Sequence, residues 1–305
     1  GNFVSSIKAK LWEDEVKFGV DLNGDGDTGL VSVEAIGGVH LKHGDNTYNG
    51  APQYYIVDGS NDPIGLTNGG PKGSTSYAGW SAIQVIASAG GGYEVLWSHT
   101  GGKHDVWKVD ASGNFVSSIK AKLWEDEEKF NQDFNGDGDT GLVAVEEIGS
   151  VHLKHGDNTY NGAPQYYIID GNSAPIGLTN GGPKGSTSYA GWSATQVIAS
   201  AGGGYEILWI NPTGNKYDVW KVDASGNFVS SIKAKLWEDE EKFNQDFNGD
   251  GDTGLVAVEE IGSVHLKHGD NTYNGAPQYY IIDGNSAPIG LTNGGPKGST
   301  SYAGW

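Results

Sequence analysis

The sequence contains no cysteine, no methionine and no arginine, so that all nineteen basic residues are lysine. The absence of cysteine excludes a disulfide framework and any thiolate site. Without arginine the chain lacks the side chain that reads phosphate in a bidentate fashion, and a net charge of −19 opposes nucleic acid and anionic lipid. No apolar run approaches the roughly 18 residues that span a membrane. We therefore expect no nucleic-acid partner and no membrane insertion.

Glycine is abundant, with 50 of the 305 residues, and one block of sequence occurs three times. Residues 113–192 and 226–305 are identical, and residues 1–80 are a close third copy. The spacing of about 112 residues is that of a whole domain and exceeds the 20 to 50 residues of a solenoid repeat. The extra residue of one copy lies in a hairpin, 210–216 against 98–103. We expect the chain to be a window on a longer array.

Within one repeat the pattern predicts a mainly β (α+β) module of antiparallel strands with one short helix. Residues 218–223 alternate apolar and polar side chains as a half-buried strand does, and a turn separates them from a strand over 228–232. Residues 122–130 are the one helical stretch. Further strands are predicted over 142–145, 151–155, 166–170, 176–179, 192–200 and 205–209. Whether the strands form a sandwich or a barrel stays open.

Each copy contains the same acidic loop, within 21–29, 133–141 and 246–254. It matches the first half of an EF-hand-type Ca²⁺ loop, with oxygen ligands at positions 1, 3 and 5 and a glycine at 6. Position 7 would contribute its backbone carbonyl. The predicted metal ligands are Asp21, Asn23, Asp25 and Asp27 in the first loop, Asp133, Asn135, Asp137 and Asp139 in the second, and Asp246, Asn248, Asp250 and Asp252 in the third.

The match to the calcium loop is incomplete, because position 12 holds Ser32, Ala144 or Ala257 in place of the bidentate glutamate. A site without that ligand is expected to bind weakly, with a dissociation constant of about 10⁻⁴–10⁻³ M. The missing oxygens would come from the preceding helix (Glu15, Glu127, Glu240) or from Glu34, Glu146 and Glu259. The alternative is that Asn-Gly and Asp-Gly serve only as turn residues, although such a turn needs no third and fourth acid.

Three motifs, in a fixed order, resemble the tryptophan-rich C-terminal domain family of bacterial surface proteins. They are Tyr205 to Trp209, then Tyr217 to Phe228, then Glu240 to Gly251. The first copy departs from the pattern at Gly19-Val20 and at His104, and we expect the fold to survive both changes. The resemblance implies a large secreted repeat protein with no defined activity. Its boundaries imply whole modules at 34–146 and 147–259, with partial modules at 1–33 and 260–305.

Three other groups of residues have a structural and a functional interpretation. The recurring tryptophans, such as Trp97, Trp107, Trp124 and Trp192, would stack on sugars if exposed, but their alternation with Val and Ile favours a core role. The recurring pair His40 and His43 is a poor metal pair on a strand. The helical acids at 125–128 are paired carboxylates of the kind that glycoside hydrolysis needs, but a solvated helix face explains them better.

These observations predict a non-enzymatic extracellular structural protein at the bacterial cell surface, a stalk, adhesin or filament subunit, with modules that Ca²⁺ stabilises. Its partners would be copies of itself or neighbouring repeats of the same chain. The alternative is a multivalent, lectin-like protein that binds cell-surface glycans through weak sites multiplied by avidity.

Overall fold

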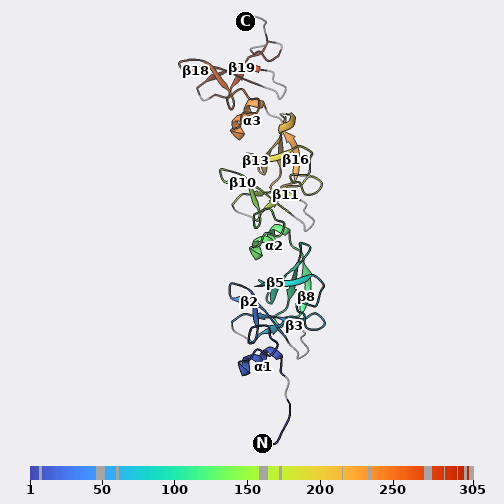
Figure 1. Cartoon of the computed structure of the whole chain (residues 1–305). Coiled ribbons are helices and arrows are strands. Elements are labelled where there is room, and N and C mark those ends of the chain that lie inside the picture. Colours follow the sequence, from blue (N-terminus) through green and yellow to red (C-terminus); the bar gives the residue numbers. More distant parts are fainter. Residues whose placement is uncertain are drawn as a thin grey trace. The chain divides into compact units, whose positions relative to one another are not determined.

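The computed structural model describes residues 1–6, 9–45, 52–59, 62–157, 164–171, 174–214, 216–232, 235–270, 277–284, 286–293, 295–298 and 301, except for the side chains of 35–36 and 147–148. The chain divides into two compact units (Figure 1). Leaving out the residues not described, the first unit covers 1–141, and the second covers 142–157 and 164–301. No helix in the described ranges is both long and apolar enough to cross a bilayer.

The first unit contains two short helices and two sheets. The helices are α1 (Leu11–Phe18) and α2 (Leu123–Phe130). The strands are β1 (Val31–Ile36), β2 (Val39–Asp45), β3 (Pro52–Val57) and β4 (Ile64–Gly65) in one sheet, and β5 (Trp80–Ala87), β6 (Tyr93–His99), β7 (Lys103–Val109) and β8 (Phe115–Ile119) in the other.

In the described residues the second unit contains two sheets of the same kind, then a helix and a further sheet. Its first sheet holds β9 (Val143–Ile148), β10 (Val151–Asp157), β11 (Pro164–Ile169) and β12 (Ile176–Gly177), and its second holds β13 (Ser193–Ala199), β14 (Tyr205–Asn211), β15 (Lys216–Val222) and β16 (Phe228–Ile232). A one-turn 3₁₀ helix, Pro212–Gly214, lies between β14 and β15, and α3 (Leu236–Phe243) follows β16. The third sheet holds β17 (Val256–Ile261), β18 (Val264–Asp270), β19 (Pro277–Asp283) and β20 (Ile289–Gly290).

Each module is built from two open antiparallel sheets that pack on one core. In every sheet neighbouring strands pair in chain order, and the first strand does not pair with the last. The predicted mainly β class is therefore confirmed, and the question of sandwich or barrel is answered by two separate sheets. The core of the first unit joins Leu41 and Tyr54 from one sheet to Val95, Trp97 and Trp107 from the other.

The second sheet of each module is buried on both faces. On the face away from the first core, Leu96 and Val106 pack with Leu123 and Phe130 of helix α2. The second unit repeats this packing with α3. The prediction that the tryptophans are core residues is confirmed for Trp97, Trp107 and Trp124, which are all buried, whereas Trp192 is only half-buried.

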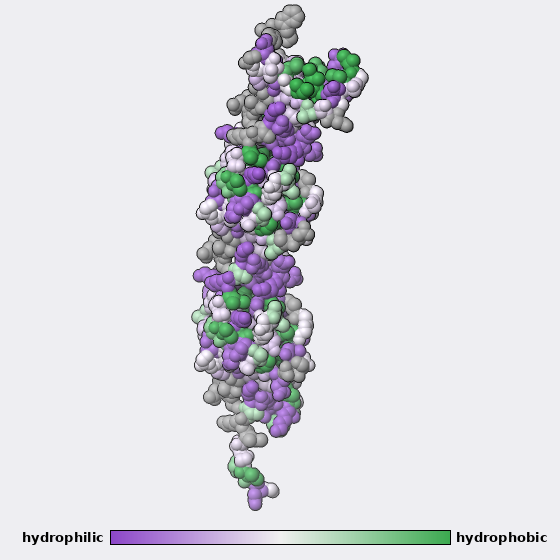
Figure 2. All heavy atoms as spheres, turned by 180° about the vertical axis from the view of Figure 1, so that it is seen from behind, coloured by the Kyte–Doolittle hydropathy of each residue, from purple (hydrophilic) through white to green (hydrophobic). Residues whose placement is uncertain are grey.

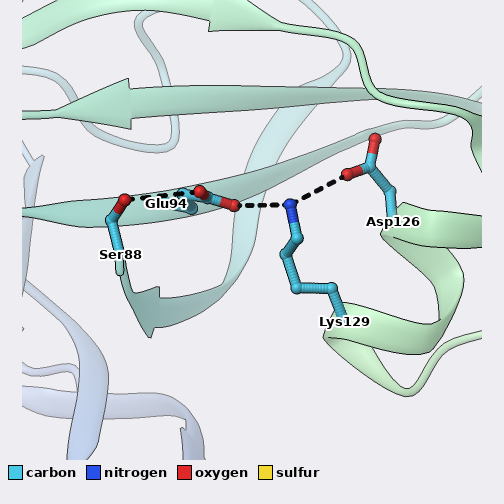
Figure 3. Close-up of polar contacts among 4 residues, drawn as sticks. All are labelled: Ser88, Glu94, Asp126 and Lys129. Carbon is cyan, nitrogen blue, oxygen red and sulfur yellow. Dashed lines mark hydrogen bonds and ion pairs between the residues drawn. The ribbon is translucent and has the colours of Figure 1, made fainter. Parts of the chain in front are cut away.

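A lysine joins the helix to an inner strand of the second sheet, as Figure 3 shows for Lys129 and Glu94 of β6 in the first unit. Lys129 Nζ lies 3.0 Å from Glu94 Oε2 and 3.4 Å from Asp126 Oδ1, and the Ser88 hydroxyl donates to the other oxygen of Glu94. Burial opposes the charge of the ammonium, but the two carboxylates outweigh it, so the pKa of Lys129 is raised. Lys242 makes the same pair of contacts in the second unit.

A short turn between the last two strands of the second sheet also joins the two sheets of a module. The Asp223 carboxylate accepts the backbone N–H groups of Ser225 and Asn227 and the Asn227 amide. Asn227 in turn accepts a hydrogen bond from the Thr179 hydroxyl, just after β12. The hydrogen bonds from Asn227 hold the pKa of Asp223 below its ordinary value of 3.8. Asp110 has the same contacts in the first unit.

This turn is expected to make the modules sensitive to acid. Since the folded pKa of Asp223 and Asp110 lies below the unfolded value, their contribution to stability is present above pH 3.8 and is lost as the pH falls through the folded pKa. Replacing both residues with asparagine should therefore flatten the acid limb of a plot of unfolding midpoint against pH. The prediction fails if the double variant loses stability below pH 3.8 as steeply as the parent chain.

The third sheet keeps part of its apolar surface exposed. Val258, Ile261, Val264 and Ile289 are each more than two-fifths exposed, whereas the matching Val151 of the second copy is buried. Figure 2 shows hydrophobic side chains gathered over the β17–β18 end of this sheet. The corresponding face of β1–β4 packs against the sheet β5–β8, and that of β9–β12 packs against the sheet β13–β16.

Candidate functional site

Each acidic loop begins directly after a helix, at a residue in the left-handed conformation. The helices are closed by Gly19, Asn131 and Asn244, with φ of 64°, 49° and 49°. Glycine and asparagine are the residues that adopt this conformation most readily. The difference between Gly19 and the two asparagines therefore leaves the end of the helix unchanged, as the sequence predicts.

The first aspartate of the loop holds the turn together. In the first loop, Asp21 Oδ1 accepts the N–H of Gly24 at 2.6 Å and Oδ2 accepts the N–H of Gly26 at 2.9 Å. Gly24 and Gly26 have φ of 79° and 94°, which an L side chain rarely adopts. The bonds from Gly26 and Gly24 lower the pKa of Asp21, and the equivalent bonds lower that of Asp133. The aspartate is therefore kept ionised by the loop that it organises.

The third and fifth positions of the loop lie against each other. Asn23 Oδ1 accepts the N–H of Asp25, and Asp25 Oδ1 accepts the N–H of Asp27, both at 2.9 Å. The Asn23 amide nitrogen donates to Asp25 Oδ2, also at 2.9 Å. Asn135 and Asn248 donate in the same way to Asp137 and Asp250. An amide N–H thus stands where the predicted site needs an oxygen.

In the first and in the third loop, a carboxylate at the end of a neighbouring strand lies beside the asparagine of that loop. Asp45, the last residue of β2, has its Oδ2 3.4 Å from the Asn23 amide nitrogen, and Asp270 of β18 has the same relation to Asn248. Asp45 is not among the ligands predicted from the sequence, and it lies 22 positions from the asparagine. No motif spacing identifies it, because only the packing of the loop against the end of the strand brings it there.

The glutamate in the middle of the helix is buried beneath the loop and binds both its ends. Glu240 is 1% exposed. Its Oε1 accepts the N–H groups of Phe247 and Asn248 at 3.0 and 3.2 Å, and its Oε2 accepts the N–H of Gly254 at 3.4 Å. Glu15 bonds Leu22 and Gly29 in the first loop. These glutamates were one predicted source of additional metal ligands, and in the structure their oxygens bind the loop backbone.

Burial disfavours the charged form of this glutamate. Desolvation raises the pKa of Glu240 and of Glu127, although the backbone N–H groups of the loop work against the rise. The prediction that the helical acids form a solvated face is therefore wrong for Asp126 and Glu127, which are 0% and 1% exposed. Their carboxylates have internal donors, the ammonium of Lys129 and the loop backbone. The buried carboxylates thus have a structural use.

An aromatic residue in the second and third loops anchors the loop to the sheet. Phe247 is buried and its ring stacks on Tyr217 of β15, with centroids 4.6 Å apart and planes 13° apart. Phe134 stacks on His104 of β7 in the same way, at 4.5 Å and 14°. His104, in place of tyrosine, therefore keeps this ring contact, which agrees with the expectation that the fold survives the change.

The remaining predicted ligands are not gathered at the loop. Glu34 and Glu259 are exposed, and in the described parts of the chain neither forms a hydrogen bond or an ion pair with an acidic loop. His265, which corresponds to His40 in the third copy, has its Nδ1 3.6 Å from Glu260 Oε1. Within the described ranges no three His, Asp or Glu side chains converge as a ready-made metal centre. The fold brings together the side chains of Asn23, Asp25 and Asp45, and Asp21 binds the backbone of the same turn.

Comparison with known families gives two matches, at residues 47–141 and 159–254. Both are to the tryptophan-rich Synechocystis species C-terminal domain. The chain belongs to this family. Each match covers about 95 residues and ends with the acidic loop. No curated protein matches the chain. The tandem, tryptophan-rich β-sheet character is thereby confirmed, and the module limits 34–146 and 147–259 stay a prediction.

Proposed function

We propose that this chain is a non-enzymatic structural array of the bacterial cell surface, a stalk, adhesin or filament subunit, in which Ca²⁺ stiffens each module. The observation that carries the proposal is the repeated acidic loop, fixed from below by a buried glutamate and bearing carboxylates on its exposed side. The hydrogen bonds of a purely structural turn account for the carboxylates of Asp21 and Asp25, but they require no carboxylate at position 7, which is Asp27 in the first loop.

The arrangement suits a cation after one small change. The Asn23 amide lies between the carboxylates of Asp25 and Asp45 and donates to both. Half a turn of that amide would exchange its nitrogen for its oxygen and bring the carbonyl oxygen toward the two carboxylates, at the cost of the bond that Oδ1 now accepts from the Asp25 N–H. Ca²⁺ prefers oxygen ligands of this kind. In our proposal the amide N–H of Asn23 occupies the place of the ion in the calcium-free loop, where it donates to both carboxylates.

The expected affinity favours a location outside the cell. A loop without the bidentate position-12 glutamate is expected to have a dissociation constant of about 10⁻⁴–10⁻³ M, as in extracellular modules. Such a loop fills at the calcium level outside a cell and not at that of the cytosol. The absence of cysteine from the sequence agrees with a metal in the role of a staple.

Near-identity of the copies favours a structural role. A contact that recurs from copy to copy without closing builds an extended object, and the neighbouring repeats would be one another's partners. The glycan-binding alternative has less support, because Trp97, Trp107 and Trp124 are at most 8% exposed and offer no open face for a sugar. Nothing in the packing of the helical acids favours an enzyme.

Calcium binding can be measured directly on the intact chain. We expect terbium luminescence, excited through tryptophan, to report three equivalent sites, and Ca²⁺ to displace the terbium with a constant of about 10⁻⁴–10⁻³ M. The control variant replaces Asp25, Asp137 and Asp250 with asparagine and should lose most of the signal. Equal luminescence from the parent chain and this variant would place the ion elsewhere and refute the proposal.

A further inference from the structure

An aromatic pocket lies in the second unit, away from the acidic loops. Its volume is about 280 Å³. Its walls come from the segment that leads into β13 and from β14 and β15. The side chains that line it are those of Tyr189, Trp192, Trp209, Asp218 and Trp220. No part of the proposed function uses this pocket.

The rings meet at angles and form a corner. The Tyr189 ring is inclined at 84° to Trp209 and at 79° to Trp220, with centroids 5.6 and 5.5 Å apart. Trp209 and Trp220 are inclined at 41° to each other, and they are 1% and 7% exposed. A sugar stacks on a broad, open ring face, which the buried rings of Trp209 and Trp220 do not offer. The half-buried rings of Tyr189 and Trp192 are the ones that a ligand reaches. A concave corner of π surface suits a compact, rounded group.

The Asp218 carboxylate lines the pocket and has no cationic partner among the described residues. Asp218 Oδ2 accepts the indole N–H of Trp220 at 3.2 Å, and its Oδ1 accepts the hydroxyl of Ser231. Throughout the described residues no lysine or histidine nitrogen comes within 4.0 Å of this carboxylate. Among the described residues, two protein donors thus fix the orientation of a negative charge that no lysine or histidine nitrogen approaches within 4.0 Å, while the ammonium of Lys184 lies 5.7 Å from the Tyr189 ring centroid.

We propose that this pocket binds a quaternary ammonium group. Aromatic faces attract a cation through the ring quadrupole, most strongly for tryptophan, and the Asp218 carboxylate supplies the opposite charge. A primary ammonium would need three acceptors, and one carboxylate that already accepts two bonds cannot provide them. A quaternary ammonium needs none. The net charge of −19 draws cations toward the chain and repels acidic ligands.

The first unit contains the same set of residues with one difference. Tyr77, Trp97 and Trp107 keep the ring geometry, and Asp105 accepts the Trp107 indole at 3.3 Å. In that unit, however, the His99 ring lies 5.1 Å from the ring of Trp80. Asn211, at the start of the longer hairpin, takes the place of His99 in the second unit. No aromatic ring in the described residues contacts Trp192, so we expect only the second pocket to be open.

The test is a titration of the intact chain with choline chloride at constant ionic strength, followed by tryptophan fluorescence and calorimetry. We expect one saturable site per chain. The control ligand 3,3-dimethylbutan-1-ol has the shape of choline without its charge and should bind at least about tenfold more weakly. Asp218→Asn should weaken choline by about tenfold as well. His99→Ala should uncover the first pocket and raise the number of sites to two.

Each other result overturns the proposal. Equal binding of choline and dimethylbutanol would mean an apolar pocket without selectivity for charge. Binding of methyl glucoside in place of choline would mean a sugar site. Absence of any choline binding to the parent chain would mean that the pocket serves packing alone. The comparison of choline with its neutral analogue uses the unmodified chain, so it stands even if a variant fails to fold.

Discussion

Replacing Glu240 with alanine is expected to destabilise the second unit by about 3 kcal/mol, because three loop N–H groups lose their acceptor. The carboxylate is buried and receives bonds from Phe247, Asn248 and Gly254, at the beginning and the end of the acidic loop. Phe247 itself is buried. A buried N–H without a partner costs about 1–3 kcal/mol, and water can reach only part of this site.

The neighbouring glutamate gives a matched control for this substitution. Glu241 lies on the same helix, its side chain is exposed, and its backbone carbonyl accepts the N–H of Asn244. Glu241→Ala keeps that backbone bond and should change stability by less than about 0.5 kcal/mol. The measurement is denaturant unfolding, together with hydrogen exchange at the amides of Phe247 and Gly254. If both variants lose the same stability, the buried glutamate does not fasten the loop.

Much of the fold follows from local sequence. The alternation in 218–223 predicts a strand there, and β15 spans Lys216–Val222. The Asp223–Asn227 turn and the strand at 228–232 are likewise read from neighbouring residues, and the structure has β16 at Phe228–Ile232. The helix is correct to one residue. These elements depend on periodicity and turn chemistry, which act over a few positions.

The burial of the helical acids does not follow from local sequence. Asp126 and Glu127 lie in a highly charged stretch and were predicted to face water. They are buried because the loop folds back over the helix and because Lys129 bridges to Glu94, which lies 35 residues away. A sequence pattern records the charge of a residue but not the donors that the fold brings to it.

The residues of the candidate site are likewise only partly predictable from local sequence. Asp21, Asn23 and Asp25 are evident from their spacing, but Asp45 enters only because β2 ends beside the loop. The pairing of an asparagine with two carboxylates is a product of tertiary packing. Spacing can therefore identify the centre of a metal site, while the residues that complete it depend on which strand ends nearby.

Removal of calcium is expected to lower the stability of every module. With a dissociation constant of about 10⁻⁴–10⁻³ M, 10 mM Ca²⁺ stabilises a folded loop by about 1.4–2.7 kcal/mol. Since these loops link each helix to the following sheet, the free energy of unfolding of each module should fall as the ion is withdrawn. Magnesium at the same concentration should have a smaller effect, because its geometry demands are stricter.

Calorimetric unfolding of the intact chain in 10 mM Ca²⁺ and in excess chelator tests the central claim most directly. A stabilisation of that size predicts a higher midpoint with calcium, by several degrees. The chain with asparagine at positions 25, 137 and 250 should show the chelator midpoint under both conditions. Identical midpoints for the parent chain with and without calcium would contradict the proposal that a divalent ion stiffens the array.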